Sequence, residues 1–384
     1  MTSIIDDIRA AFERERDQAR PVREASEIPF TYEHITPEWL TAVLCHRVPQ
    51  AKVTGHRLDV ADDGNSNRRR IFVEYNAAGR DAGLPERVFC KASQGFANRI
   101  SLGLSGAVKA EVDFYRHVRP LLDLESPVAY HAAFDPQTLN SIIVLGDLGP
   151  QTEFCTHTTD ITRARVEGQI RLLARLHGRF LEMPDLATRF SMLPTWSAFF
   201  GRLDYPDFEK ACDHGFGLAE AMIPPRLFAR RAEVWPATRR SAQQADALPP
   251  TLAHGDDHLR NWYIAPGGAM GLNDWQALTR THWARDVVYA LTTSLTIDQR
   301  RAWEHDLLSS YFEQLQRVAG RKLSFDGAFD AYRRQLMTVL AFWTITINPA
   351  PGMPDMQPRD STLEFIRRIA TAIDDLGSLD AVGS

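Results

Sequence analysis

The chain has 384 residues, of which 44% are hydrophobic and 24% charged, and its formal net charge is −5. This length suits two domains or lobes, and a chain without a basic excess is a poor candidate for a dedicated nucleic-acid binder. Its four cysteines are scattered without a CxxC pair, which argues against a disulfide framework or a cysteine zinc site and favours a reducing, cytoplasmic compartment.

No targeting or membrane segment is visible in the sequence. The first 20 residues are charged throughout and lack the apolar core of a signal peptide. The most apolar late run, 336–345, is much shorter than the ~20 residues that a membrane-spanning helix needs. We therefore expect a protein that binds neither membranes nor nucleic acid, and composition leaves its oligomeric state open.

The first third of the chain predicts two helices followed by strands. Residues 4–20 form a charged helical pattern, and Thr36, Pro37 and Glu38 are typical of a capped helix start. Alternating residues then predict three strands of an antiparallel sheet, over 56–60, 70–75 and 86–92.

The rest of the chain becomes mostly helical. A helix is predicted over 107–118 and a buried strand over 141–145, and from about residue 160 the apolar periodicity is helical. Gly and Pro cluster between the two regions. The fold class is therefore α+β, divided as an N-terminal helical extension over 1–34, a small lobe with an antiparallel sheet over 35–148, and a larger helical lobe over 149–384.

One decapeptide, HGDDHLRNWY at 254–263, concentrates polar chemistry. Asp256 and Asn261 have the spacing D-x-x-x-x-N, in which the Asp accepts the proton of a substrate hydroxyl and the Asn binds magnesium. Asp274 follows a short apolar stretch and offers a second carboxylate to the metal. A few oxygen ligands completed by phosphate oxygens are what Mg²⁺ prefers. The spacing alone is common, so its weight depends on the upstream half.

The upstream half supplies the other parts of a phosphotransferase. Lys91 lies near the end of a predicted strand, where its charge can reach ATP phosphates, and Glu111 lies in the next helix, where it can pair with that lysine. The preceding turn can lay backbone N–H groups against phosphates. Its tip residues are Gly64, Asn65, Ser66 and Asn67.

These motifs together resemble the aminoglycoside phosphotransferase and choline-kinase-like superfamily of small-molecule kinases. The carrying segments are HGDDHLRN (254–261), NDWQ (273–276), WARDVVYAL (283–291), VFCKAS around Lys91 and AEVDFY around Glu111. The branch that the chain resembles most is the ecdysteroid-kinase-like one, and the likeness covers roughly residues 35–375. It implies a protein-kinase-like fold with two lobes, and ATP and Mg²⁺ bound in the cleft between them.

The resemblance also assigns roles that spacing does not. It implies that Gly146, Asp147 and Leu148 form the hinge that holds adenine. It implies that Asp286 supports the catalytic loop and that His258 does likewise. Two positions depart from the family: the turn over the phosphates has a single glycine, and Gly146 stands where relatives often carry an acid.

Two other readings of the decapeptide stay open. Asp256 and Asp257 can simply cap a helix, because acids favour helix N-termini. A metal-dependent hydrolase would use His254, Asp256, Asp257 and His258 as ligands, although the other histidines are dispersed without paired spacing. A non-catalytic nucleotide-binding protein is a third alternative, against which every chemical position holds a competent residue.

The acceptor is expected to be a small molecule with a hydroxyl group. Seven of the eight tryptophans lie in the helical half, and aromatic surfaces bury apolar ligands well. We therefore expect a hydrophobic or steroid-like alcohol, with an aminoglycoside, choline or a sugar as the alternative. The tentative acceptor residues are Trp196, Phe200, Trp275 and Trp283.

Overall fold

The computed structural model describes residues 2–203, 207–324, 327–348 and 356–383. The chain divides into two compact units, and each is described by itself. The first comprises residues 1–121 and 127–149, and the second comprises residues 122–126 and 150–384. Among the described residues, no helix is both long and apolar enough to cross a membrane.

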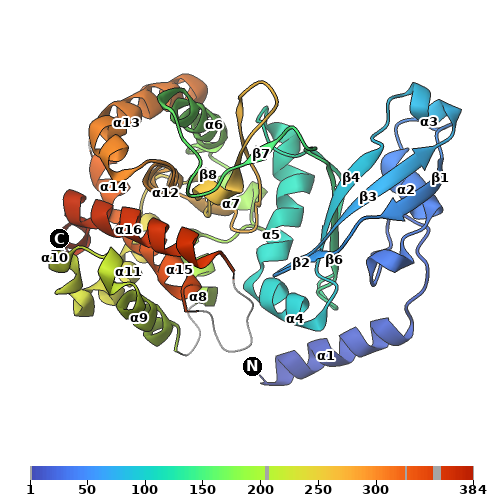
Figure 1. Cartoon of the computed structure of the whole chain (residues 1–384), viewed down its shortest axis with the longest axis horizontal. Coiled ribbons are helices and arrows are strands. Elements are labelled where there is room, and N and C mark those ends of the chain that lie inside the picture. The colour runs from blue at the N-terminus through green and yellow to red at the C-terminus, as the bar shows by residue number, and fades with distance from the viewer. Residues whose placement is uncertain (1, 204–206, 325–326, 349–355, 384) are drawn as a thin grey trace. The chain divides into compact units, whose positions relative to one another are not determined.

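The first unit is built on one antiparallel sheet (Figure 1). Its strands run in the order β1-β3-β4-β6-β5, and the short β2 forms a hairpin with β3. All the strand predictions of this region correspond to strands in the structure, and β5 is an addition that was not predicted. The bounds are β1 (Val53–Leu58), β2 (Asp62–Asp63), β3 (Asn67–Tyr75), β4 (Arg87–Ala92), β5 (Ala129–Phe134) and β6 (Ser141–Gly146).

Helices complete the first unit. The Thr36 side chain accepts a hydrogen bond from the Trp39 N–H and so caps α2, as the sequence predicts. Trp39 is fully buried and packs in a core with Tyr32 and the inward residues of the sheet. The predicted helix over 107–118 is interrupted, since its second half, 114–118, is π-helical. The bounds are α1 (Thr2–Asp17), α2 (Pro37–Leu44), α3 (Ala77–Asp81), α4 (Phe96–Asn98) and α5 (Ala107–Asp113).

The second unit is mostly helical (Figure 1). Its longer helices, α6 and α13, pack against each other, and α15 packs against α9, α11 and α16. The bounds are α6 (Arg163–Phe180), α7 (Leu186–Arg189), α8 (Trp196–Leu203), α9 (Phe208–Leu218), α10 (Pro225–Phe228), α11 (Arg231–Ala245), α12 (Ala284–Ser294), α13 (Ile297–Ala319), α14 (Ala328–Arg334), α15 (Leu336–Thr346), α16 (Arg359–Leu376) and α17 (Ser378–Gly383).

Two small sheets in the second unit hold the two ends of the decapeptide 254–263 and fix its position. A two-stranded sheet joins β8 to β11, and a three-stranded sheet has the order β10-β9-β7. The segment 254–261 connects β8 to β9, and Asp274 follows β10 two residues later. The bounds are β7 (Glu153–Phe154), β8 (Thr251–Ala253), β9 (Trp262–Ile264), β10 (Met270–Leu272) and β11 (Thr279–Thr281).

The four cysteines, Cys45, Cys90, Cys155 and Cys212, are free and buried. Burial raises the pKa of the Cys155 thiol to about 12 and also raises the pKa of Cys45. Burial raises the pKa of Cys90 as well, so these three thiols do not form a reactive thiolate near neutral pH.

Candidate active site

The loop between β8 and β9, residues 254–261, is fixed by a glycine that no other residue can replace without strain. Gly255 has φ of 81°, and a Cβ built on it would lie 2.3 Å from the carbonyl oxygen of Ala277. A side chain there would therefore be strained by its backbone conformation and would also clash with backbone. This close approach brings the loop against the segment that follows Asp274.

Asp286, in the first turn of the buried helix α12, holds the start of the loop. Its carboxylate accepts hydrogen bonds from the backbone N–H groups of His254 at 2.6 Å and Gly255 at 2.8 Å. His177 of α6 contacts the same carboxylate at 3.0 Å through Nε2. Burial alone would raise the pKa of Asp286, but the hydrogen bond from His177 and the neighbouring imidazoles lower it overall. An ionised Asp286 is therefore a stable anchor for the loop backbone.

Three further side chains of α12 contact the loop at other points. Arg285 donates to the Gly255 carbonyl at 3.0 Å, and Thr293 Oγ1 accepts from the Leu259 N–H at 3.1 Å. Tyr289 donates from its hydroxyl to Asp256 Oδ1 at 3.1 Å. These positions are four residues apart, so they lie on one face of the helix. The loop is thus supported along its length by a single rigid element.

Asp256 contacts α12 on one side and solvent on the other. Tyr289 occupies Oδ1, while 38% of the Asp256 side chain remains exposed. Close packing around the carboxylate, followed by the charge of Asp274, raises the pKa of Asp256 to about 7. A carboxylate with that pKa is suited to accept a proton at neutral pH, because general bases work best when their pKa is near the working pH.

Asn261 and Asp274, the predicted metal ligands, lie near Asp256. The Asn261 side chain donates from Nδ2 to the Asp256 carbonyl at 2.7 Å, which directs its Oδ1 away from that carbonyl. Asn273 binds the Asn261 carbonyl through its backbone N–H and side-chain N–H groups, at 3.0 and 2.9 Å. Asp274 has φ of 63°, a left-handed conformation that costs free energy in residues other than glycine and that is common at functional sites.

His258 and the neighbouring Asp257 are internal side chains. His258 Nε2 lies 3.7 Å from Asp256 Oδ2, and its ring packs on Trp343 and Tyr289. Burial lowers the pKa of His258 to about 3, so the ring is neutral. Asp257 is buried as well, and burial together with the charge of Asp286 raises its pKa well above the usual range.

The metal-hydrolase alternative lacks a ligand cluster in the described part of the chain. No group of three or more His, Cys, Asp or Glu side chains there is arranged to hold a metal ion. His254, one of its four ligands, binds the Asn273 carbonyl through Nε2 at 2.9 Å and accepts from the Asp256 N–H through Nδ1 at 3.2 Å. Both ring nitrogens of His254 are thus engaged in holding the loop.

Lys91 and Glu111 form an ion pair in the first unit. Lys91 Nζ lies 2.8 Å from the Glu111 carboxylate, and the two side chains are 11% and 2% exposed. Lys91 belongs to the central strand β4 and Glu111 to α5. A carboxylate that is almost fully buried fixes the ammonium group in one place, so the lysine presents a positioned charge.

The predicted phosphate turn is the tip of the β2–β3 hairpin. Asp63 pairs with Asn67, and Gly64, Asn65 and Ser66 lie between them. The Gly64 N–H donates to the Ser66 carbonyl at 3.1 Å. Gly64 does not have a positive φ, so its backbone does not require glycine.

The segment 146–148 begins at the last residue of β6, and its acid, Asp147, comes one position after Gly146. Asp147 accepts from Arg70 Nε at 2.8 Å, and Arg87 lies 3.7 Å away. The Gly146 N–H donates to the Val128 carbonyl at 2.8 Å. Two basic side chains therefore hold Asp147, and the adenine-binding role of Gly146, Asp147 and Leu148 stays a prediction.

The four tentative acceptor residues are all buried. Trp196 and Phe200 belong to a cluster of aromatic side chains, and Trp275 and Trp283 pack elsewhere in the second unit. The Trp196 ring lies 4.2 Å from the Arg285 guanidinium, which itself donates to the Gly255 carbonyl in the 254–261 loop. Arg285 therefore links the cluster to Gly255. An acceptor role for the cluster stays a prediction.

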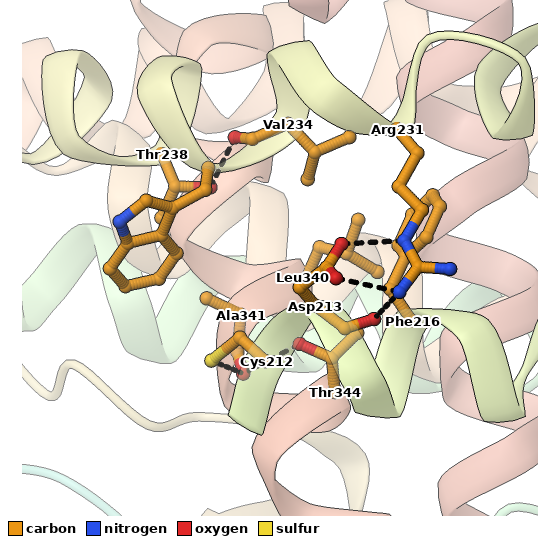
Figure 2. Close-up of a pocket in the computed structure, with 10 residues that line it drawn as sticks. Cys212, Asp213, Phe216, Arg231, Val234, Thr238, Leu340, Ala341 and Thr344 are labelled. Atoms are coloured by element: carbon orange, nitrogen blue, oxygen red, sulfur yellow. Dashed lines mark hydrogen bonds and ion pairs between the residues drawn. The ribbon is translucent and has the colours of Figure 1, made fainter. Parts of the chain in front are cut away.

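A small cavity lies beside this cluster, between α9, α11 and α15 (Figure 2). Trp235, Phe216 and Leu340 contribute to its lining, and Arg231 is paired with Asp213 at its edge. Its volume of about 20 Å³ is enough for one water molecule. This cavity is too small to receive an acceptor molecule.

Sequence reasoning missed the side chains that hold Asp256 and the loop, namely His177, Arg285, Tyr289 and Thr293. A signal for three of them was present. All the residues of α12 are buried, yet it carries polar side chains at 285, 289 and 293. Polar residues at helical spacing in a buried helix need hydrogen-bond partners. They therefore indicate that this face of the helix binds another polar segment of the chain.

The chain is similar in fold to solved structures of kinases, and a family model matches it. The chain matches no curated protein sequence. It is similar in structure to the amicoumacin kinase hAmiN, solved with AMP-PNP, Ca²⁺ and Ami, with 10% identity, 83% of this chain and 88% of that chain covered, and a TM-score of 0.51. A Ralstonia eutropha protein classed with the aminoglycoside phosphotransferases gives 13% identity, 86% and 94% coverage, and a TM-score of 0.50.

These two likenesses confirm the protein-kinase-like α+β fold, because identities this low reflect fold alone. A family model described as the phosphotransferase enzyme family matches residues 60–321, which is more than half of the chain. That span includes the turn, Lys91 and the loop around Asp256. The chain therefore belongs to the phosphotransferase enzyme family, and it is a small-molecule kinase.

Proposed function

We propose that this kinase transfers the γ-phosphoryl group of ATP to a hydroxyl group of a hydrophobic alcohol, with Mg²⁺. The observation that carries the proposal is the state of Asp256, which has one carboxylate oxygen held by Tyr289, an exposed side and a pKa near 7. Such a group is suited to accept the proton of an incoming hydroxyl. The transferred phosphoryl group needs little covalent help, so positioning and charge account for most of the rate.

The chain's own residues divide the work. Asp256 orients the acceptor hydroxyl and takes its proton as the oxygen attacks phosphorus. Lys91, fixed by Glu111, binds the phosphates of the nucleotide, and the turn over 64–67 contributes backbone N–H groups. The segment 146–148 binds adenine.

Asn261 and Asp274 fit a magnesium ion. An amide oxygen and a carboxylate oxygen are hard donors of the kind that Mg²⁺ binds. The left-handed backbone of Asp274 costs free energy, and such conformations are common at functional sites. When bound, the ion would neutralise charge on the phosphates. His258 and Asp286 support the loop rather than bind the ion, since the His258 ring is buried against Tyr289 and Trp343 and the Asp286 carboxylate is engaged with backbone N–H groups.

An apolar acceptor is favoured by the aromatic cluster next to the loop. Trp196 stacks on Phe199 and lies near Phe200 and Phe342, all in the second unit. A polycationic sugar would instead call for clustered carboxylates. Sterols and other hydrophobic alcohols are therefore the first acceptors to test, ahead of aminoglycosides, choline and sugars. The ecdysteroid-kinase-like resemblance favours the same choice.

The experiment combines nucleotide binding with an acceptor screen. Mg-ATP affinity is measured by calorimetry, and ATP consumption is then followed with each acceptor class, with Asp256→Asn as the control. ATP consumption with an apolar alcohol that is greatly slowed in Asp256→Asn supports the proposal. Phosphate release without any acceptor would indicate a hydrolase, and ATP binding without turnover by any acceptor would indicate a binding protein. Efficient phosphorylation of an aminoglycoside or choline alone would overturn the choice of acceptor.

A further inference from the structure

The tip of the β2–β3 hairpin is held by a side chain from outside the hairpin. Asn98, at the end of α4, donates from Nδ2 to the Gly64 carbonyl at 3.0 Å and to the Asn65 carbonyl at 2.7 Å. One amide group thus fixes two successive peptide units of the tip. Its own Oδ1 lies close to Gly95, where an added Cβ would come within 2.7 Å of it. A glycine at 95 is therefore what allows Asn98 to reach the tip.

A second contact joins the same two segments in the opposite direction. Asn67, the last residue of the tip, accepts through its side-chain oxygen from the backbone N–H groups of Gln94 at 2.8 Å and Gly95 at 3.3 Å. Its Nδ2 donates to Asp63 Oδ1 at 3.0 Å. The tip and the segment 94–98 are therefore linked by reciprocal side-chain to backbone hydrogen bonds. The position of the tip depends on the position of that segment.

The N-terminal helix α1 fixes that segment through a buried charge. Arg99, next to Asn98, is fully buried and forms an ion pair with Glu15 of α1. The guanidinium also donates to the Ser93 carbonyl at 3.1 Å and the Thr138 carbonyl at 3.2 Å. Removing one partner of a buried ion pair is strongly unfavourable, because it leaves the other charge buried without compensation. Glu15 is thus needed for Arg99 to stay where it is.

Aromatic contacts between α1 and the segment lie on the other side of Asn98. The Phe96 ring packs edge-on against Phe12 with centroids 5.6 Å apart, and the Arg9 guanidinium lies 4.3 Å above the Phe96 ring. Phe96 and Arg99 flank Asn98 in sequence, and both have partners in α1. The charged helix at the start of the chain is therefore packed against the segment that carries Asn98.

We propose that Asn98 is a positioning residue for the nucleotide phosphates, and that α1 belongs to the nucleotide-binding apparatus because it fixes the segment carrying Asn98. This inference rests on the proposed function of the 64–67 tip as a phosphate contact. Asn98 touches the tip and not the nucleotide. Its loss therefore affects the part of the binding affinity that the phosphates contribute, and leaves the part that adenosine contributes.

Calorimetry on the full chain tests this with Mg-ATP and adenosine as the two probes. We expect Asn98→Ala to weaken Mg-ATP binding about 10-fold, the worth of one or two hydrogen bonds, and to change adenosine binding less than about twofold. Asn76→Ala is the matched control, since Asn76 also donates to a loop carbonyl of the first unit, that of Gln50 at 2.8 Å. Asn76→Ala is expected to leave both affinities unchanged.

The role of α1 is tested by a charge change alone. Glu15→Gln keeps the size of the side chain and removes the charge opposite Arg99, and we expect Mg-ATP binding to weaken about threefold to 10-fold. Glu13→Gln is the control, because Glu13 is an exposed acid of the same helix. Hydrogen exchange of the amides over 61–68 is expected to accelerate in Asn98→Ala and Glu15→Gln, and in neither control.

Lys91→Ala separates failure of this inference from failure of the proposed function. If Lys91→Ala weakens Mg-ATP binding while Asn98→Ala binds Mg-ATP as the wild type does, the positioning role is wrong and the nucleotide site stands. If neither variant changes Mg-ATP binding, the nucleotide site itself is wrong and the inference falls with it. Equal losses of Mg-ATP and adenosine affinity in Asn98→Ala would also overturn it, because they indicate a general disturbance of the unit.

Discussion

The two segments proposed to handle phosphate, the 254–261 loop and the 64–67 tip, are held in different ways. The loop is attached to one buried helix by Arg285, Asp286, Tyr289 and Thr293, which contact it at four points. The tip projects from a sheet, is partly exposed, and is held by Asn98 from a short neighbouring helix.

The difference suits the roles that we propose for the two segments. A general base must keep its carboxylate oriented to within tenths of an ångström, so it is carried on a rigid element. A phosphate contact made by backbone N–H groups has to admit the nucleotide and release it, and a hairpin tip with few attachments permits this. The second unit therefore holds its loop by buried polar contacts, whereas the first holds its tip by a few partly buried ones.

The largest expected effect comes from removing charge at Asp274. Asp274→Asn keeps the size of the side chain and tolerates the left-handed backbone, but it offers a neutral oxygen to the metal. We expect phosphate transfer to fall by about 10³-fold or more, because metal ligation supplies several kcal/mol to such reactions. Steady-state kinetics measure this, with circular dichroism to verify the fold. Near-normal turnover in the folded variant would contradict the metal assignment.

Removing the base itself is expected to cost somewhat less. Asp256→Asn retains the hydrogen bond from Tyr289 and the shape of the loop, so Mg-ATP binding is preserved. We expect transfer to slow by about 10²- to 10⁴-fold, the usual worth of general acid–base catalysis. Rate measurements at saturating ATP and a separate binding titration check the two parts. Loss of Mg-ATP binding without a separate rate effect would point to a structural role.

The two glycines, Gly255 and Gly64, test the contrast between the segments directly. An alanine at 255 would place its Cβ 2.3 Å from the Ala277 carbonyl oxygen and would keep a positive φ, whereas the nearest atom to a Cβ at 64 is the end of Arg68, at 3.4 Å. We expect Gly255→Ala to lower the free energy of unfolding by about 2–3 kcal/mol and to reduce activity. Gly64→Ala is expected to do neither. Chemical denaturation measures the free energy of unfolding of both variants. Equal losses of stability would contradict the difference in how the two segments are held.

Tyr289 is expected to contribute less than Asp256 and to act through it. Tyr289→Phe removes the hydroxyl that donates to Asp256 Oδ1 and keeps the ring that packs near Arg285. We expect kcat to fall about 10-fold with little change in either KM, as for the loss of one hydrogen bond to a charged group. The control is Tyr332→Phe, because Tyr332 also donates to a buried carboxylate, that of Glu304 at 2.7 Å. An equal loss of kcat in both variants would indicate a general effect of stability.

The smallest expected effect is a pH dependence of stability that both units share. Burial lowers the pKa of His131 in the first unit to about 4 and that of His282 in the second to about 3. These rings are neutral when folded and take up protons more readily when unfolded, with a pKa of about 6.5. Stability is therefore lost as pH falls from about 6.5 towards 4, by roughly 1–2 kcal/mol per histidine at pH 5.

Denaturation at pH 7.5 and pH 5 measures this dependence, and His131→Leu is expected to reduce it. Burial leaves His131 Nε2 without a hydrogen-bond partner among the described residues, so leucine removes both the titrating group and an unsatisfied polar atom. An unchanged difference between the two pH values in His131→Leu would contradict the assignment of His131 to this dependence.

The sequence predicts most of the strands and site motifs, but few of the tertiary contacts that join them. The strands, the Thr36 cap and the D-x-x-x-x-N spacing depend on local chemistry, so they are visible in a single chain. The Lys91–Glu111 ion pair, expected from family order, is present. The roles of Asp256, Asn261 and Asp274 stay predictions, as does the closeness to ecdysteroid kinases.

Other features depend on tertiary contacts that no local pattern encodes. Strand β5 has a mixed burial pattern and was not predicted, because its pairing with β6 supplies what its own residues do not. His177 reaches Asp286 from 109 residues away, and the Tyr289–Asp256 hydrogen bond joins residues 33 apart. The polar residues at 285, 289 and 293 of α12 are unusual in a buried helix, but the sequence does not show that they contact the 254–261 loop.

The buried cysteines have a practical consequence for following the hairpin tip in solution. Since all four native thiols are buried, we expect that a maleimide dye does not react with them in the folded protein. A single cysteine introduced as Ser66→Cys would then take the label alone, at the tip of the β2–β3 hairpin. A change in the fluorescence of that dye on adding Mg-ATP would test whether nucleotide reaches the tip, without knowledge of the acceptor.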